Sequence, residues 1–160
     1  MNTPLARFGL TLLLLSLCSA RVLAQDLTAR NGAIAKMDKG EVVVTLPDSF
    51  GEWPAVTGLG NKKTPAGIRS VTIEFEIRSN TPLSSKMVVS EFNTPYTYYS
   101  DIKEIQIDGT WRKQRITFEL HDTGTTPLNL PLFLFDDSAP KGEVRIRGWK
   151  VSFDGKPAAN

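Results

Sequence analysis

The sequence is poor in the residues that many enzymes use for chemistry. Its 160 residues include one Cys and one His. One Cys cannot form a disulfide within its own chain, so a disulfide-stabilised scaffold is excluded. One His argues against histidine-rich metal sites and most His-dependent catalytic triads. Glycine-rich phosphate loops and dinucleotide-binding fingerprints are also missing from the sequence.

Strong charge of one sign is missing as well. The chain has 19 Lys and Arg against 17 Asp and Glu, a formal net charge of +2. A balance this even gives no strong attraction to nucleic acid or to an anionic membrane. The hydrophobic content of 41% is high enough for a folded core, and the length suggests one domain.

Residues 1–24 have the pattern of a secretory signal peptide. Arg7 supplies a positive n-region, and residues 8–17 form an apolar stretch of about ten residues, too short to span a bilayer. Val22 and Ala24 give the small-residue cleavage pattern, so a mature chain would begin at residue 25. We therefore expect a secreted or periplasmic protein without a membrane partner after cleavage.

Two alternatives apply to this segment. One is a retained membrane anchor, and the other is lipidation at Cys18, which the bulky Leu17 before it disfavours. Cleavage would remove Arg7 and Arg21 and no acid, leaving 19 − 2 = 17 basic against 17 acidic residues. The mature chain would then have no net charge and no cysteine.

The mature sequence has the period of β-strands. Between Val71 and Arg78, apolar and polar residues alternate, the pattern of a strand with one buried face. Only residues 27–36 could be mildly helical, and Asn31-Gly32 interrupts that stretch. We expect strands at 41–46, 71–78, 86–92, 96–107, 111–120, 128–135 and 143–153.

This order of elements favours an all-β fold, an antiparallel two-sheet sandwich. No helical crossovers separate the strands, which excludes parallel α/β architectures. We expect one sandwich domain over residues 25–155 and a flexible tail at 156–160. Asp108-Gly109 predicts a tight turn, and a change of phase in the last strand predicts a bulge at Gly148.

Several short motifs could carry catalysis or metal binding, but each has a simpler explanation. Asp122-Thr123-Gly124 matches the aspartic-protease triplet, yet it stands in a polar turn. Glu74 and Glu76 share one face of a strand roughly 7 Å apart, a separation that suits a glycosidase pair. Arg145 and Arg147 repeat that spacing on the last strand, so a charged, solvated sheet face is the favoured interpretation. Asp136-Asp137 could offer oxygen ligands to Ca²⁺, although a turn with two acids before Pro140 and Gly142 is the commoner explanation.

Aromatic residues are the most distinctive feature of the chain. Trp53 follows turn residues, Tyr96, Tyr98 and Tyr99 cluster after Pro95, and Trp111 is out of phase with the strand that follows it. Flat rings of this kind stack on the C–H faces of sugars and lose little side-chain entropy when they bind. The alternative for each of these rings is a place in the core, which is favoured for Trp111 and more strongly for Trp149, because Trp149 alternates with Val151 and Phe153.

The order of these segments resembles the carbohydrate-binding modules of families four, nine and twenty-two. The resemblance lies in the proline–glycine turn and strand of residues 64–75 (TPAGIRSVTIEF), the Gly-Thr-Trp segment of residues 109–118, the tryptophan strand at 52–56, and the closing strand at 144–153. It implies a galactose-binding-like jelly roll that binds a glycan in a cleft on one concave sheet, often with a structural Ca²⁺.

Two departures from the family pattern bear on the metal. Arg147-Gly148 stands where the closing strand of these modules carries a pair of acidic or amide residues, and Asn31-Gly32-Ala33-Ile34 matches the usual early motif only in part. We therefore expect no cofactor and no metal site, with a structural Ca²⁺ as the alternative. Such modules usually accompany a catalytic domain, which this sequence lacks, so a separate secreted glycan-active enzyme is a possible partner.

The sequence thus predicts a secreted, non-catalytic protein that binds a poly- or oligosaccharide and has no nucleic-acid partner. The predicted carbohydrate-binding residues are Trp53, Tyr96, Tyr98, Trp111, Gln114, Arg115 and Glu119. The alternative is a secreted structural or assembly protein that uses the sandwich face for protein contacts. A third class, a small hydrolase or lyase, would depend on Glu74 or His121.

Overall fold

A computed structural model describes residues 27–48, 53–57, 64–94, 97–121, 126–136, 141–154 and 156–157. The predicted signal peptide lies outside the described residues, as do Tyr96, Asp137 and the Asp122-Thr123-Gly124 triplet. Among the described residues, no helix is long and apolar enough to cross a membrane.

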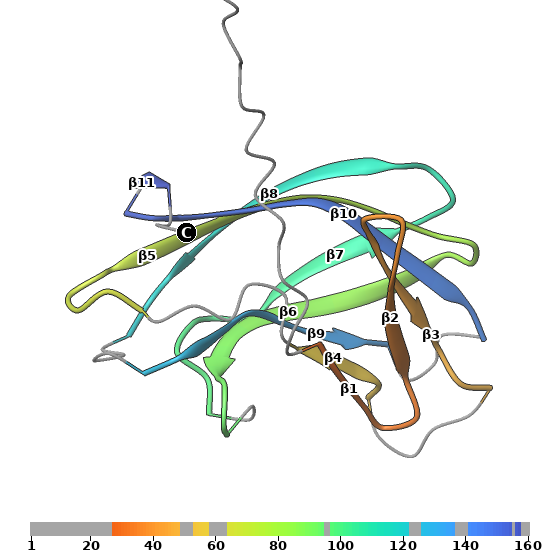
Figure 1. The fold of residues 1–160 in the computed structure, drawn as a ribbon, viewed down its shortest axis with the longest axis horizontal. Helices are drawn as coiled ribbons and strands as arrows, with labels where there is room; N and C mark the ends of the chain where they lie inside the picture. Colours follow the sequence, from red (N-terminus) through yellow and green to blue (C-terminus); the bar gives the residue numbers. More distant parts are fainter. Residues whose placement is uncertain are drawn as a thin grey trace, which may run out of the picture.

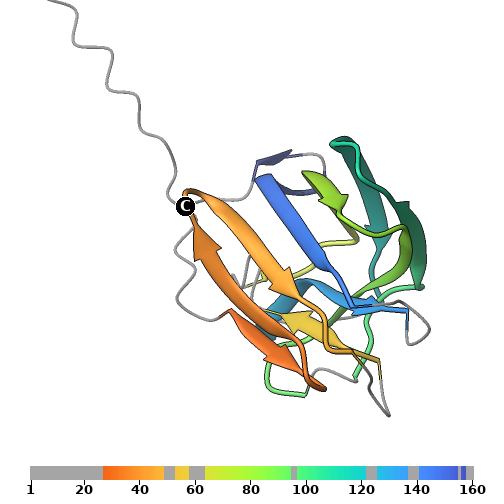
Figure 2. The ribbon, with the colours of Figure 1, turned by 90° about the vertical axis from the view of Figure 1, so that its right-hand side faces the viewer.

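Eleven strands in the described part of the chain form two antiparallel sheets that face each other (Figure 1). The five-stranded sheet has the order β1-β4-β9-β6-β7, and the six-stranded sheet has the order β2-β3-β10-β5-β8, with β11 paired to β10. Figure 2 shows the orange hairpin of β2 and β3 and the teal β8 at opposite edges of the sandwich. The strand bounds are β1 Thr28–Arg30, β2 Ile34–Asp38, β3 Glu41–Thr45, β4 Ala55–Thr57, β5 Ser70–Ser79, β6 Leu83–Glu91, β7 Lys103–Ile107, β8 Arg112–Glu119, β9 Leu128–Phe135, β10 Glu143–Phe153 and β11 Lys156–Pro157.

The architecture confirms the predicted antiparallel two-sheet sandwich. Five of the expected strands correspond closely to β3, β5, β8, β9 and β10. The long strand expected at 96–107 is shorter: β7 begins at Lys103, and Tyr98 and Ser100 form only isolated bridges before it. Lys156 and Pro157, placed by sequence in the tail, pair with the end of β10.

The core lies between the sheets. From the six-stranded sheet, Val71, Ile73, Phe75 and Ile77 of β5 point inward and are at most 1% exposed. Trp149 of β10 packs on them, its ring 5.1 Å from that of Phe75, which confirms its predicted place in the core. From the five-stranded sheet, Met87, Val89, Phe133 and Phe135 are among the residues that complete the same cluster.

The prediction of a mildly helical segment at residues 27–36 is wrong. β1 and β2 occupy this stretch, and Asn31 and Gly32 between them have positive φ angles of 55° and 80°. Two successive residues in the left-handed region form the tight turn that an Asn-Gly pair favours, and they end any helix. β2 then pairs with β3 along its whole length, and this pairing outweighs the weak local preference.

The predicted bulge at Gly148 is confirmed. The register between β10 and β5 shifts between Arg147 and Lys150, and Gly148 has a φ of +66°. The extra residue changes which side of the strand the side chains face. Arg147 therefore faces solvent beside Glu76, whereas Trp149 turns into the core.

Candidate functional site

The sandwich has two outer faces on which a ligand could bind. We call the outer side of the five-stranded sheet the five-strand face and that of the six-stranded sheet the six-strand face. Strand alternation assigns each side chain to the core or to one outer face.

The five-strand face has an apolar centre. Ala55, Val88, Leu132 and Leu134 form a cluster separate from the main core and are at most 9% exposed, although their strands turn them away from the core. Trp53 packs against this cluster. The Nζ atom of Lys86 lies 4.2 Å from the centroid of the Trp53 ring, within the range of a cation–π contact.

Polar side chains surround that centre. The strand register places Arg30, Ala55, Leu134, Lys86 and Glu104 in one row across β1, β4, β9, β6 and β7. In the neighbouring row, Gln106 pairs with Ser84, and its Nε2 donates to Glu104 Oε1 at 3.3 Å. An apolar strip is thus bordered by hydrogen-bonding groups at both ends.

Backbone contacts hold the Trp53 segment from two sides. Asn31 Nδ2, in the β1–β2 turn, donates to the backbone oxygen of Trp53 at 2.7 Å. On the other side, the N–H of Phe135 in β9 donates to the oxygen of Pro54 at 2.9 Å. These contacts hold the backbone at Trp53 and Pro54 in place, and with it the starting point of the Trp53 side chain.

Asn129 of β9 lies farther along the same face. Its Nδ2 donates to Ser90 Oγ at 3.1 Å and to Glu91 O at 2.9 Å. Its Oδ1 is buried, and it has no hydrogen-bond partner among the described residues. Tyr98 forms a bridge with Ser90 and is 38% exposed, whereas Tyr99 packs on the main core. The two tyrosines therefore face opposite ways, as alternation predicts.

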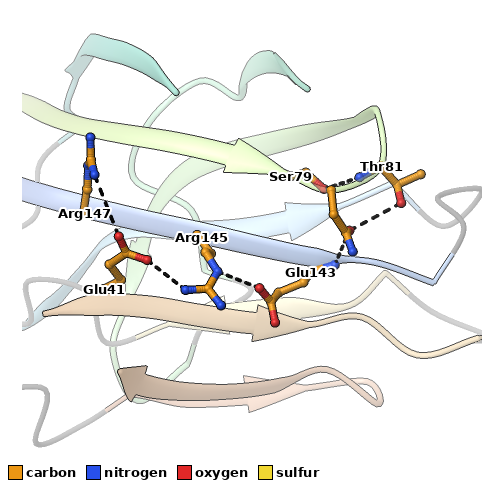
Figure 3. A network of polar contacts seen from close by, with 7 residues as sticks. Glu41, Ser79, Thr81, Glu143, Arg145 and Arg147 are labelled. Atoms are coloured by element: carbon orange, nitrogen blue, oxygen red, sulfur yellow. Dashed lines mark hydrogen bonds and ion pairs between the residues drawn. The ribbon is translucent and has the colours of Figure 1, made fainter. Parts of the chain in front are cut away.

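The six-strand face is charged. Glu41 of β3 contacts Arg145 at 3.1 Å and Arg147 at 3.9 Å, and Arg145 also reaches Glu143 at 2.6 Å (Figure 3). These two glutamates, Glu143 first, raise the pKa of Arg145 above its usual value by hydrogen bonding. The network confirms the interpretation of this surface as a solvated ionic face.

Glu74 and Glu76 do not act as a pair with each other. Glu76 binds Arg147 at 2.7 Å, and Glu74 binds Arg115 at 2.8 Å. Each carboxylate is thus bound by a different guanidinium, so the two do not form the pair of cooperating carboxyl groups that glycoside hydrolysis needs.

Trp111 precedes β8 and lies on the six-strand face. The Cζ atoms of Arg147 and Arg78 are 4.0 Å and 4.9 Å from its ring centroid. The ring is partly buried. Its position out of phase with Phe118 of β8, visible in the sequence, is the reason that it points outward.

The structure does not gather the predicted binding residues into one site. Trp53 and Tyr98 belong to the five-strand face. The six-strand face contains Trp111, Arg115 and Glu119. Gln114 lies opposite Phe75 on the inner side of β8, and Tyr96 is outside the described residues. The physical reason is sheet membership, because β8 pairs with β5 and not with β6. Sequence reasoning also missed Arg30, Lys86, Glu104 and Asn129, which only strand pairing and register bring to the same face.

The described residues offer no other obvious chemistry. They contain no cluster of three or more His, Cys, Asp or Glu side chains that could hold a metal ion. Two carboxylates that lie outside both faces, Asp108 and Asp154, have lowered pKa values. Hydrogen bonds from Arg112 and from the Thr110 N–H lower the pKa of Asp108, and the N–H groups of Arg69 and Ser70 lower that of Asp154. Asp108 is half-buried and Asp154 is exposed, and the hydrogen bonds of both are to neighbouring structural groups.

Comparison with known proteins identifies the fold. A scan against family models finds none that matches, and a search of curated proteins finds no match either. Solved structures do match. A carbohydrate-binding module designated CBM4 aligns with a TM-score of 0.61 at 14% identity, covering 82% of this chain and 88% of that one. The chain has the fold of carbohydrate-binding modules.

A second structure supports the same assignment. The N-terminal cellulose-binding domain of the β-1,4-glucanase C from Cellulomonas fimi aligns with a TM-score of 0.58 at 13% identity, covering 81% of this chain and 90% of that one. A third, described as a carbohydrate-binding module of BiXyn10A, aligns with a TM-score of 0.57 at 6% identity over 76% of this chain and 80% of that one. At sequence identities of 14%, 13% and 6%, the similarity shows a shared fold.

Proposed function

We propose that this protein is a non-catalytic carbohydrate-binding protein that holds a poly- or oligosaccharide against its five-strand face. The observation that carries the proposal is the position of Trp53, an indole packed on an apolar cluster and bordered by Lys86, in a fold shared with carbohydrate-binding modules. Tyr98, partly exposed farther along the same face, is the second aromatic surface.

The chemistry of this face suits a sugar. A pyranose ring has an apolar C–H face that can lie on an indole, and hydroxyl groups around its edge that need hydrogen-bond partners. Arg30, Lys86, Glu104 and Gln106 supply donors and acceptors on both sides of the apolar cluster. Because the Trp53 backbone is already held by Asn31, little additional ordering is needed on binding.

The proposal includes a secreted or periplasmic location and action beside a separate glycan-active enzyme. The location rests on residues 1–24, whose sequence has the signal-peptide pattern. The paired glutamates of the six-strand face support a binding role over hydrolysis, because each has its own arginine.

Titration of the protein against a panel of neutral oligosaccharides tests the proposal. We expect weak binding, roughly micromolar to millimolar, that Trp53→Ala lowers by about tenfold or more. Trp111→Ala is the matched control, because it removes the same side chain from the opposite face. Circular dichroism melts of both variants confirm that each still folds.

Two results would contradict the proposal. The first is an absence of binding across the panel, which would favour the alternative of a structural or assembly protein. The second is loss of binding in Trp111→Ala with unchanged binding in Trp53→Ala, which would move the site to the six-strand face.

A further inference from the structure

The six-strand face contains an aromatic–cation cluster that neutral-sugar binding on the five-strand face does not use. Trp111 lies against the guanidinium groups of Arg78 and Arg147, with Cζ-to-centroid distances of 4.9 Å and 4.0 Å. A ring held against two cations is partly immobilised, so it offers a prearranged surface to a ligand.

The arginines of this face differ in how they are neutralised. Arg147 contacts Glu76 and Glu41, and Arg145 contacts Glu41 and Glu143. Arg78 has no carboxylate within ion-pair distance anywhere in the described part of the chain. Its one charge-related contact there is the ring of Trp111.

Strand register places the positive charge of Arg78 next to other cations in the unbound protein. Arg78 of β5 stands directly opposite Arg145 of β10, and Arg145 stands opposite Val43, which itself pairs with Lys36 of β2. Like charges placed directly across two strands destabilise a sheet. The row that includes Arg78 has three cations and no acid. Arg145 is paired with Glu41 and Glu143 from outside the row, whereas Arg78 stands beside it without a carboxylate of its own, so a bound anion would supply the missing partner.

We propose that Arg78 and Trp111 form a second binding site, specific for a uronic acid residue of an acidic glycan. The carboxylate accepts two parallel hydrogen bonds from the Arg78 guanidinium, a geometry that arginine provides and lysine does not. The C–H face of the same sugar ring packs on the part of Trp111 that the two guanidinium groups leave exposed, since this residue is only partly buried. This site is independent of the proposed function, because it lies on the other sheet and takes a charged ligand.

The surroundings favour a sparsely charged glycan over a nucleic acid. Glu41, Glu74, Glu76 and Glu143 all lie on this face, and the whole chain has a net charge of only +2. A phosphate backbone presents a charge at every nucleotide and needs many basic contacts to bind. Arg78, which has no carboxylate partner, lies beside the ring of Trp111. This arrangement matches a ligand with a single carboxylate on a sugar ring.

A matched pair of probes tests this site. We would titrate the purified protein with a short oligogalacturonide and with its methyl ester, which keeps the sugar ring and removes the charge. Binding of the acid form is expected at low salt and should weaken as salt rises, whereas the ester should bind at least about tenfold more weakly.

Variants then locate the site. Arg78→Gln and Trp111→Ala should each weaken binding of the acid by about tenfold or more. Arg115→Gln, which removes a paired arginine from the same face, should leave it unchanged. Trp53→Ala, on the other face, shows whether the five-strand face contributes to binding of the acid. A thermal melt of Arg78→Gln checks that the variant still folds, since the substitution also removes the cation–π contact with Trp111.

Several results would overturn the inference. They are absence of binding by the acid, equal binding of acid and ester, equal losses in Arg78→Gln and Arg115→Gln, and loss in Trp53→Ala alone. Preference for an oligothymidylate over the oligogalacturonide at equal salt would also reject it and indicate a nucleic-acid ligand.

Discussion

At the residue scale, Asp154 shows how one exposed carboxylate joins two strands. It follows β10, and its Oδ1 accepts hydrogen bonds from the backbone N–H groups of Arg69 and Ser70 at 3.0 Å and 2.9 Å, where β5 begins. These bonds favour the ionised form and hold the pKa of Asp154 below its usual value of 3.8.

This shift predicts a pH-dependent contribution to stability. In the unfolded chain Asp154 has its ordinary pKa, so as the pH falls through about 4 the unfolded state binds the proton first. The contribution is complete above that pH and is lost as the pH falls toward the lower pKa of the folded state. Asp154→Asn, which tolerates the positive φ of 44° at this position, should lower the melting temperature at pH 7.

Thermal melts at pH 7 and pH 3 check this expectation. The difference between the wild type and Asp154→Asn should shrink at pH 3, because the unfolded wild-type chain is then protonated at Asp154 and must lose that proton to form the charged hydrogen bonds on folding. Asp101→Asn, a change at another exposed aspartate, is the control and should show no such trend. A deficit of equal size at both pH values would show that the carboxylate charge is not responsible.

At the element scale, the bulge in β10 depends on one glycine. Gly148 has a φ of +66°, and a Cβ built on it would meet no atom within 4 Å. The cost of Gly148→Ala is therefore conformational alone, about 1–2 kcal/mol for an L residue in the left-handed region. Urea unfolding should show this loss of stability with an unchanged denaturant slope.

Gly109→Ala is the control for that measurement. Gly109 does not have a positive φ, and its added Cβ would meet only the Ser79 oxygen at 3.9 Å, an ordinary contact. We expect a change within about 0.5 kcal/mol, as for most surface substitutions. Equal losses at Gly148 and Gly109 would mean that the bulge does not require a left-handed residue.

The turn between β1 and β2 acts on another element, the segment leading into β4. Asn31→Gly keeps the backbone freedom needed at a φ of 55° but removes the hydrogen bond to the Trp53 oxygen. We expect a loss of about 1 kcal/mol, typical of one hydrogen bond. If Trp53 binds the glycan as proposed, affinity should also fall, because the indole is held less firmly.

Calorimetric titration and urea unfolding of Asn31→Gly measure the two effects separately. Asn31→Ala should be less stable than Asn31→Gly, since it adds backbone strain to the same lost bond. If Asn31→Gly matched the wild type in both affinity and stability, Asn31 would have no role in positioning Trp53.

At the scale of the whole molecule, the two outer faces should behave independently. Trp53 and Trp111 belong to different sheets, and packed sheets lie about 10 Å apart with the core between them. The stability losses of Trp53→Ala and Trp111→Ala should therefore add in the double variant to within about 0.5 kcal/mol.

A double-mutant cycle by urea unfolding measures this additivity. Glycan affinities of the single variants provide the second comparison, since each substitution should affect the ligand of its own face. A coupling energy above about 1 kcal/mol would show that the core transmits changes between the faces.

Much of the fold follows from local patterns. The alternation in β5 and the phase change in β10 indicate strands, the inward position of Trp149 and the bulge, because each depends on neighbours a few residues away. β9 is different: all eight of its residues are buried, so alternation cannot assign Leu132 and Leu134 to an outer face.

The sequence by itself determined that this chain is an all-β sandwich with more aromatic residues than its core needs, because period and phase are local properties. Only the tertiary structure decided that Trp53 and Trp111 lie on opposite faces, that residues 27–36 form strands, and that Arg78 stands opposite Arg145. Those facts depend on which strands pair and in what register, and pairing joins residues that are far apart in the chain.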